Sequence, residues 1–113
     1  MANKQRREVE VTILGESLLL RPTFAALAEL EDRLGMGLPY VAYQVSQQKM
    51  GMKFVPAVIY AGLVGAGNKK FTYEQIEEMC FEEGILKLAP VAISLLLGAL
   101  TGTQSEEVEQ KKK

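Results

Sequence analysis

Apolar and polar residues alternate near the start of the chain and then give way to helical spacing. From Glu8 to Ile13 every second residue is apolar, and its neighbours are charged or hydroxyl residues. A period of two is typical of a strand with one solvated face. Gly15-Glu16 follows as a two-residue loop, because glycine takes the positive φ that such loops require. We therefore predict a β-hairpin over residues 8–21.

The hydrophobic pattern also predicts the register of this hairpin. A loop at Gly15-Glu16 sets Leu14 beside Ser17 and places Glu10 opposite Arg21 as a charge pair on the solvated face. The opposite face is then apolar and is expected to pack on the rest of the protein. Its residues are Val11, Ile13, Leu18 and Leu20.

Beyond the hairpin, apolar residues recur every three or four positions and predict helices. The expected helices cover residues 23–34, 39–49, 54–66, 73–83 and 85–100. Thr23 is a natural N-cap and Gly35 a natural C-cap of the first of them. Thr72 and Gln75 have the spacing of a capping box and predict the start of the fourth.

These elements place the chain in the α+β class, mostly α, with an N-terminal β-hairpin followed by four or five short helices. Residues 1–102 are expected to form a single domain, with the hairpin at 8–21 and the helical part at 23–101. The polar, mixed-charge residues 103–113 predict a disordered C-terminal tail. A chain of 113 residues is too short for two separate cores.

Composition removes most catalytic chemistry. The chain has no histidine and one cysteine, Cys80, which excludes Cys/His zinc sites, histidine-dependent nucleophilic catalysis and an internal disulfide. The carboxylates of residues 73–83 stand on a predicted helix, whereas metal sites draw them from loops. The glycines of residues 62–67 end a helix, so they do not form a phosphate loop. We expect no enzymatic activity, no catalytic residues, no cofactor and no metal.

Charge and hydropathy narrow the kinds of partner. Thirteen basic and fourteen acidic residues leave a net charge of −1, which argues against a nucleic-acid partner. The longest uncharged apolar stretch, residues 88–105, contains one proline and two glycines. Its dense apolar part is shorter than the roughly 20 residues that a bilayer span needs. We expect a cytoplasmic protein with no membrane partner and no targeting segment.

Two uncharged segments carry most of the functional information. Residues 34–48 and 54–68 contain no charged residue. Because small domains bury only about 60–70% of their surface, part of this apolar surface is expected to contact another chain. The alternative is a tightly packed helical core. Core or partner contacts are predicted for Val58, Ile59, Leu63, Leu95, Leu96 and Leu97.

Several motifs in residues 7–100 together resemble the gene transfer agent family. The motifs are REVEV at 7–11, LRPTF at 20–24, ALAELE at 26–31, VIYAGL at 58–63 and TYEQI at 72–76. Members of this family are small proteins of phage-like tail gene clusters and are classed with tail assembly chaperones.

The resemblance implies a non-enzymatic tail assembly chaperone in the cytoplasm of a bacterial host cell. Such a chaperone forms a homo-oligomer, binds the tape-measure protein and tail-tube subunits, and is absent from the finished particle. The alternative is a structural neck or tail-completion subunit that is retained in a phage-like particle.

Overall fold

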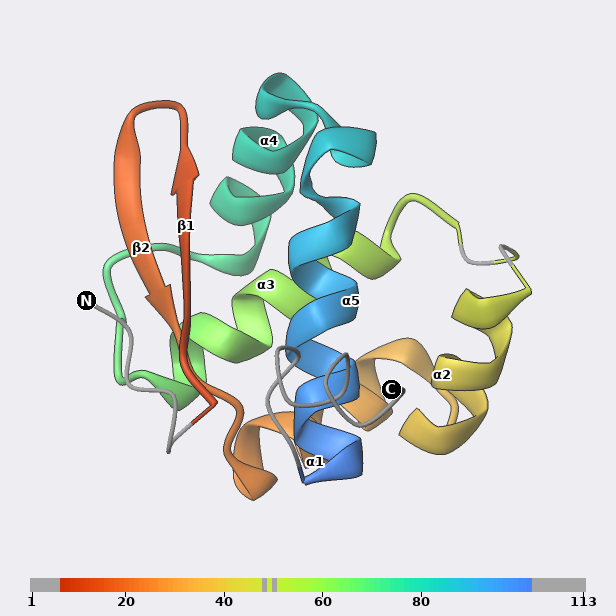
Figure 1. Cartoon of the computed structure of the whole chain (residues 1–113). Coiled ribbons are helices and arrows are strands. Elements are labelled where there is room, and N and C mark those ends of the chain that lie inside the picture. Colours follow the sequence, from red (N-terminus) through yellow and green to blue (C-terminus); the bar gives the residue numbers. More distant parts are fainter. Residues whose placement is uncertain (1–6, 48, 50, 103–113) are drawn as a thin grey trace, which may run out of the picture.

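Within the described residues, the chain folds as an N-terminal hairpin followed by five helices (Figure 1). The structure is a computed structural model and describes residues 7–47, 49 and 51–102. The elements are β1 (Val9–Ile13), β2 (Glu16–Leu20), α1 (Phe24–Leu34), α2 (Leu38–Ser46), α3 (Phe54–Gly65), α4 (Tyr73–Glu83) and α5 (Ile85–Thr101). The predicted α+β class is confirmed, and the predicted tail at 103–113 lies outside the described residues.

The hairpin turns at Leu14 and Gly15, one residue earlier than predicted. Both residues have positive φ, 51° and 83°, as a two-residue loop of type I′ requires. Leucine rarely adopts this conformation, but a contact from α4 supports it here. The backbone N–H of Leu14 donates a hydrogen bond of 2.7 Å to Oε1 of Glu83. The turn therefore depends on a contact that spans most of the chain.

The predicted register is consequently wrong by two residues. Glu10 lies opposite Leu19, not Arg21. In place of the predicted charge pair, a carboxylate oxygen of Glu10 accepts a hydrogen bond of 3.1 Å from the Ser17 hydroxyl. A shift of two residues keeps every side chain on its original face, so the predicted apolar face is confirmed. Its members are at most 7% exposed: Val11, Ile13, Leu18 and Leu20.

The predicted caps of α1 and α4 are confirmed. The Thr23 hydroxyl accepts the N–H of Ala26 at 3.2 Å, and Gly35 ends α1 with φ of 74°. At the start of α4, the side chains of Thr72 and Gln75 each accept the backbone N–H of the other residue, at 3.1 and 2.8 Å. These local signals are sufficient to position both helices.

α2 is shorter than predicted and is capped by a different helix. It ends at Ser46, before the predicted limit of residue 49. Its N-cap, Gly37, has no side chain that could accept a backbone hydrogen bond. The carboxylate of Glu31 in α1 supplies this acceptor and receives the N–H of Leu38 at 2.8 Å. Glu31 thereby fixes the connection between the two helices.

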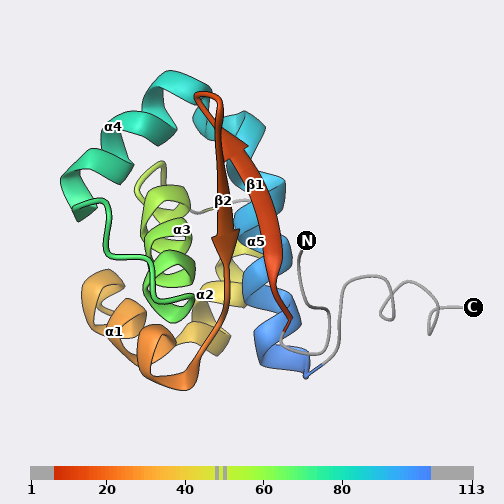
Figure 2. The same cartoon turned by 90° about the vertical axis from the view of Figure 1, so that its left-hand side faces the viewer.

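α3 lies at the centre of the fold and packs against α1, α4, α5 and β2 (Figure 2). Nine of its twelve residues are buried. Two glycines permit the close approach of the hairpin: a Cβ on Gly62 would lie 2.7 Å from Cβ of Leu20, and one on Gly65 would lie 1.9 Å from the Arg21 carbonyl oxygen. The N–H of Arg21 also donates to the Gly62 carbonyl at 2.9 Å.

α5 covers another side of α3. Its buried residues are Leu88, Ala92, Leu95, Leu96 and Gly98. Among the described residues, no helix is both long and apolar enough to cross a membrane.

Candidate interaction surface

α4 and α5 meet at a sharp corner with a single residue between them. Gly84 has φ of 121°, a conformation that side chains rarely permit, so α4 ends at Glu83 and α5 begins at Ile85 without a linker. This corner turns two large apolar side chains outward. Phe81 is 65% exposed and Leu86 is 87% exposed.

The segment between α2 and α3 faces this corner. Met52 lies there and is 63% exposed. The next apolar residues, Phe54 and Val55, begin α3 and are buried. Val45 in α2 is partly buried and packs against the same core. Apolar side chains from three helices and one connection are thus directed to one place.

An open groove of about 480 Å³ lies between these parts, and we call it the apolar groove. Its lining residues are Val45, Gly51, Met52, Phe54, Val55, Ile85, Leu86, Ala89 and Ile93. None of these residues is charged, and the lining of the groove is mostly apolar. Exposed apolar surface of this kind marks interaction sites on soluble proteins.

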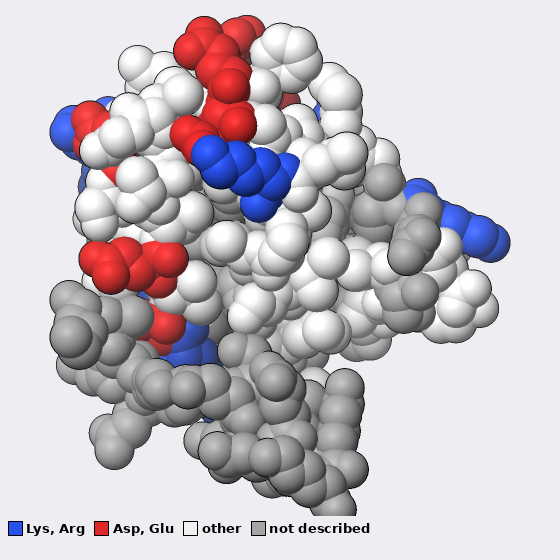
Figure 3. Space-filling view, turned by 45° about the horizontal axis from the view of Figure 1, so that its top comes forward, with Lys and Arg blue, Asp and Glu red and all other residues white. Residues whose placement is uncertain are grey.

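A second hollow of about 350 Å³ shares Met52 and Ile85 with the apolar groove and extends along α4. We call it the acidic hollow. Its other lining residues are Lys53, Pro56, Glu77, Glu78 and Phe81. Figure 3 shows acidic side chains gathered at the top of the molecule, beside a cation, with a broad uncharged surface below them. The candidate surface is therefore apolar on one side and acidic on the other.

The carboxylates of α4 differ in their availability to a partner. Glu83 accepts hydrogen bonds from the Lys87 ammonium group and from the N–H of Leu14, and these bonds, that from Lys87 foremost, lower the pKa of Glu83. Glu77 lies beside Tyr73: burial and then the negative charge of Glu77 raise the pKa of this tyrosine. Glu78 is exposed and pairs with no described residue. It is the most available carboxylate of the acidic hollow.

A cation and two aromatic rings join three helices beside this surface. The guanidinium of Arg33 in α1 lies 3.9 Å from the ring centroid of Tyr73 and 5.3 Å from that of Tyr60. The two rings meet edge to face, with centroids 5.4 Å apart. Such contacts stabilise packing, and here they hold α1, α3 and α4 together.

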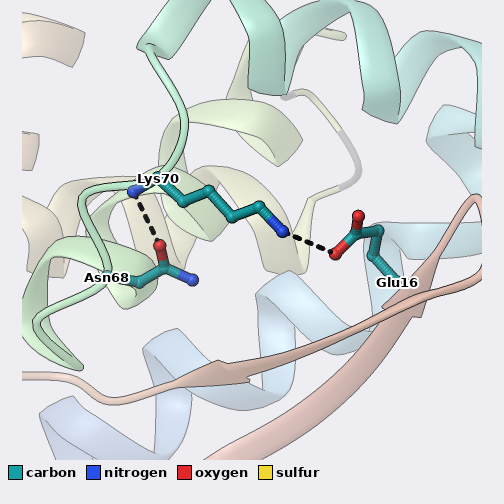
Figure 4. A network of polar contacts seen from close by, with 3 residues as sticks. All are labelled: Glu16, Asn68 and Lys70. Atoms are coloured by element: carbon teal, nitrogen blue, oxygen red, sulfur yellow. Dashed lines mark hydrogen bonds and ion pairs between the residues drawn. The ribbon is translucent and has the colours of Figure 1, made fainter.

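The hairpin side of the molecule is fixed by polar contacts (Figure 4). In the connection between α3 and α4, the N–H of Lys70 donates to Oδ1 of Asn68 at 2.9 Å. The Lys70 ammonium group reaches Oε1 of Glu16 in β2 at 3.5 Å. This cation follows the glycine-rich segment 62–67 and is paired with a carboxylate of the chain itself.

The structure separates the six residues predicted for core or partner contacts. Five of them are at most 1% exposed and belong to the core: Val58, Ile59, Leu63, Leu95 and Leu96. Leu97 is 41% exposed. A partner can reach the first five only if the fold opens. Their partner role stays a prediction.

The sequence did not predict the exposed apolar residues of the apolar groove and the acidic hollow. Met52 lies between the predicted helices 39–49 and 54–66, and Leu86 lies at the start of the predicted helix 85–100. Phe81 could have been found, because it lies off the apolar stripe that Ile76 and Cys80 define at helical spacing. An aromatic residue outside the buried stripe of an acidic helix is a signal of exposed apolar surface.

Cys80, the single cysteine of the chain, lies in the core. It is fully buried, and desolvation raises the pKa of its thiol to about 11. The described part of the chain contains no group of three or more cysteine, aspartate or glutamate residues that could hold a metal ion.

The described residues form a mostly helical protein with an uncharged groove on its surface. The model of a family described as phage tail tube protein, GTA-gp10, matches residues 6–102, and the chain belongs to this family. This match confirms the predicted relation to gene transfer agents and phage tails. No curated protein and no solved structure shows a significant match to the chain.

Proposed function

We propose that this protein is a tail assembly chaperone that binds its client through the apolar groove and carries out no chemical reaction of its own. The observation that supports this proposal is the exposure of Met52 and Leu86 in the uncharged apolar groove, with Phe81 exposed in the adjoining acidic hollow. Exposed apolar side chains that are gathered at a groove, rather than scattered singly, are typical of a surface that a partner covers. A cytoplasmic assembly factor meets its client before the particle is complete.

The proposed client is the tape-measure protein, a long helical protein, with tail-tube subunits as a second partner. An amphipathic helix binds by laying its apolar face in a hydrophobic groove, and residues one turn apart serve as anchors. The groove lies between Val45, Met52 and Leu86 and offers apolar contacts on opposing sides. A homo-oligomer would present several such grooves along one client and raise the total affinity.

A second candidate is a structural subunit retained in the tail or its neck. The family description as a phage tail tube protein favours this candidate. In that case a neighbouring subunit of the particle would cover the apolar groove. The two candidates differ in whether the protein remains after assembly.

Co-expression with a tape-measure protein, the proposed client, tests the proposal. Affinity purification and light scattering should give a soluble complex with several copies of the chain per client. Leu86→Asp should fold and lose the client, whereas Glu29→Gln on α1, outside the groove, should retain it. A monomer that leaves the client insoluble would contradict the chaperone role.

Mass spectrometry of purified particles then separates the two candidates. A chaperone should be absent from mature particles, although it is abundant during their assembly. Stoichiometric amounts of the chain in the particle would establish the structural subunit.

A further inference from the structure

We infer that the segment bound by this surface is an amphipathic helix with a basic edge, whose apolar stripe fills the apolar groove and whose cations face the acidic hollow. This inference rests on the proposed function and adds the charge and the orientation of the client segment.

The geometry joins the two hollows into one site. Met52 and Ile85 line both, so an occupant of the apolar groove also borders the acidic hollow. A helix is about 10–12 Å wide with its side chains, and its apolar stripe is flanked by polar positions. When the stripe faces the groove, one flank lies against α4. The residues on that flank therefore face Glu77 and Glu78.

The charged residues of the acidic hollow determine which charge is favoured on the flank of the bound helix. Among the described residues, the acidic hollow is lined by one cation, Lys53, and by two carboxylates, Glu77 and Glu78. Like charges across an interface are repelled and opposite charges increase the rate and specificity of association. A lysine or arginine on the flank is thus favoured over an acidic residue.

None of the described helices combines an apolar stripe with several cations along one edge. α1 contains Arg33 as its only cation beside three carboxylates, and α5 contains only Lys87, which is paired with Glu83. Residues 1–6 and 103–113 lie outside the described part of the chain. These two segments contain three apolar residues: Met1, Ala2 and Val108. Neither end can supply an apolar stripe. The occupant that fits is a separate basic, amphipathic partner.

Two synthetic peptides test this inference on the full chain. Each has about 18 residues, long enough for a helix, and the same leucine stripe at helical spacing. One carries lysines along one edge of the stripe and the other carries glutamates there. Fluorescence anisotropy should show that the lysine peptide binds at least about fivefold more tightly than the glutamate peptide does. The reason is that its lysines can pair with Glu77 and Glu78 of the acidic hollow. Salt at about 0.5 M should reduce this preference.

Substitutions in α4 and α5 identify the residues that cause the preference for the lysine peptide. Glu78→Lys should weaken binding of the lysine peptide and strengthen that of the glutamate peptide. Glu82→Lys is the matched control, because Glu82 is exposed on the same helix but does not line the acidic hollow. It should leave the preference largely unchanged. Leu86→Asp should weaken binding of both peptides, with unchanged helicity by circular dichroism.

Equal affinity for both peptides, preference for the glutamate peptide, or binding of neither would overturn the inference. Light scattering that shows a dimer displaced by neither peptide would also overturn it, since a second copy would then occupy the site. Failure of the proposed function is distinguishable: the lysine peptide would bind with the expected preference, but the tape-measure protein would not co-purify.

Discussion

The two sides of α3 differ in how their apolar residues are covered. On the hairpin side, Gly62 and Gly65 let β2 approach so closely that no side chain fits between them. On the groove side, α3 begins with buried residues, but their neighbours Met52 and Leu86 extend into solvent. The same helix thus faces a completed interface on one side and an incomplete one on the other.

This difference separates residues that maintain the fold from residues that remain available for binding. Close-packed interiors respond strongly to changes in volume or charge, whereas exposed positions tolerate them. Substitutions on the hairpin side and in the core should lower the free energy of unfolding. Substitutions at the apolar groove should affect binding while the fold persists.

The largest effect is expected for a charge placed in the core. Leu63 is 1% exposed, so Leu63→Asp buries an unpaired carboxylate, and we expect a loss of more than about 4 kcal/mol in the free energy of unfolding. That loss is comparable to the whole stability of many domains, so circular dichroism should show an unfolded chain. Leu97→Asp, at an exposed position, should cost about 1 kcal/mol or less. Native helicity for Leu63→Asp would contradict the assignment of this side chain to the core.

The next effect concerns the contact between α3 and the hairpin. Gly65→Ala places a Cβ 1.9 Å from the Arg21 carbonyl oxygen, and the backbone must move to relieve the clash. We expect a loss of about 3 kcal/mol, measured by urea unfolding. Gly51→Ala is the control, because nothing lies within 4 Å of its added Cβ. Equal stability of the two variants would show that the hairpin does not pack on α3 as described.

Local signals predicted the ends of elements well, and tertiary contacts explain the exceptions. The caps at Thr23 and Thr72 depend on residues three positions apart, so a single sequence contains the whole interaction. The hairpin register depends on Leu14, whose positive φ is supported by Glu83 from a distant helix. No pattern within the hairpin encodes that contact.

The candidate surface was harder to predict than the fold. An uncharged segment is equally compatible with a buried helix and with an exposed one, and α3 proved to be buried. Phe81 and Leu86 lie on either side of Gly84, which turns α4 into α5, and Met52 lines the same groove as Leu86. Their proximity arises from the angle between helices, which side-chain periodicity along one helix does not determine.

The next prediction concerns the thiol of Cys80, which is buried in the core. Burial raises the pKa of Cys80 from 9.0 to about 11, which reduces the thiolate fraction about 100-fold at pH 8. We therefore expect an aromatic disulfide reagent to label the folded chain at least about 100-fold more slowly than the chain in denaturant. The absorbance of the aromatic thiolate that the reagent releases measures both rates. Rapid labelling of the folded chain would show that this part of the core opens readily.

The smallest effect is expected at the hairpin turn and depends on pH. The bonds from Lys87 and Leu14 hold the pKa of Glu83 below its ordinary value of 4.5. Their stabilising contribution is present above pH 4.5 and is lost as the pH falls through the lowered pKa. Glu83→Gln should therefore lower Tm at pH 7, and this difference should shrink as the pH is lowered to 3.

The matched control for this pH dependence is Glu82→Gln, because Glu82 is exposed on the same helix. Its effect on Tm should be small at both pH values. A Glu83→Gln difference that stays constant between pH 7 and pH 3 would contradict the role of the ionised carboxylate.

The most direct test of the separation between fold and binding is Leu86→Asp, compared with the wild-type chain in two assays. Leu86 is 87% exposed in the first turn of α5, where an acidic residue suits the helix N-terminus. We expect the free energy of unfolding to change by less than about 0.5 kcal/mol and the co-purified tape-measure protein to be lost. A variant that retains the client like the wild type, or one that unfolds, would contradict the separation.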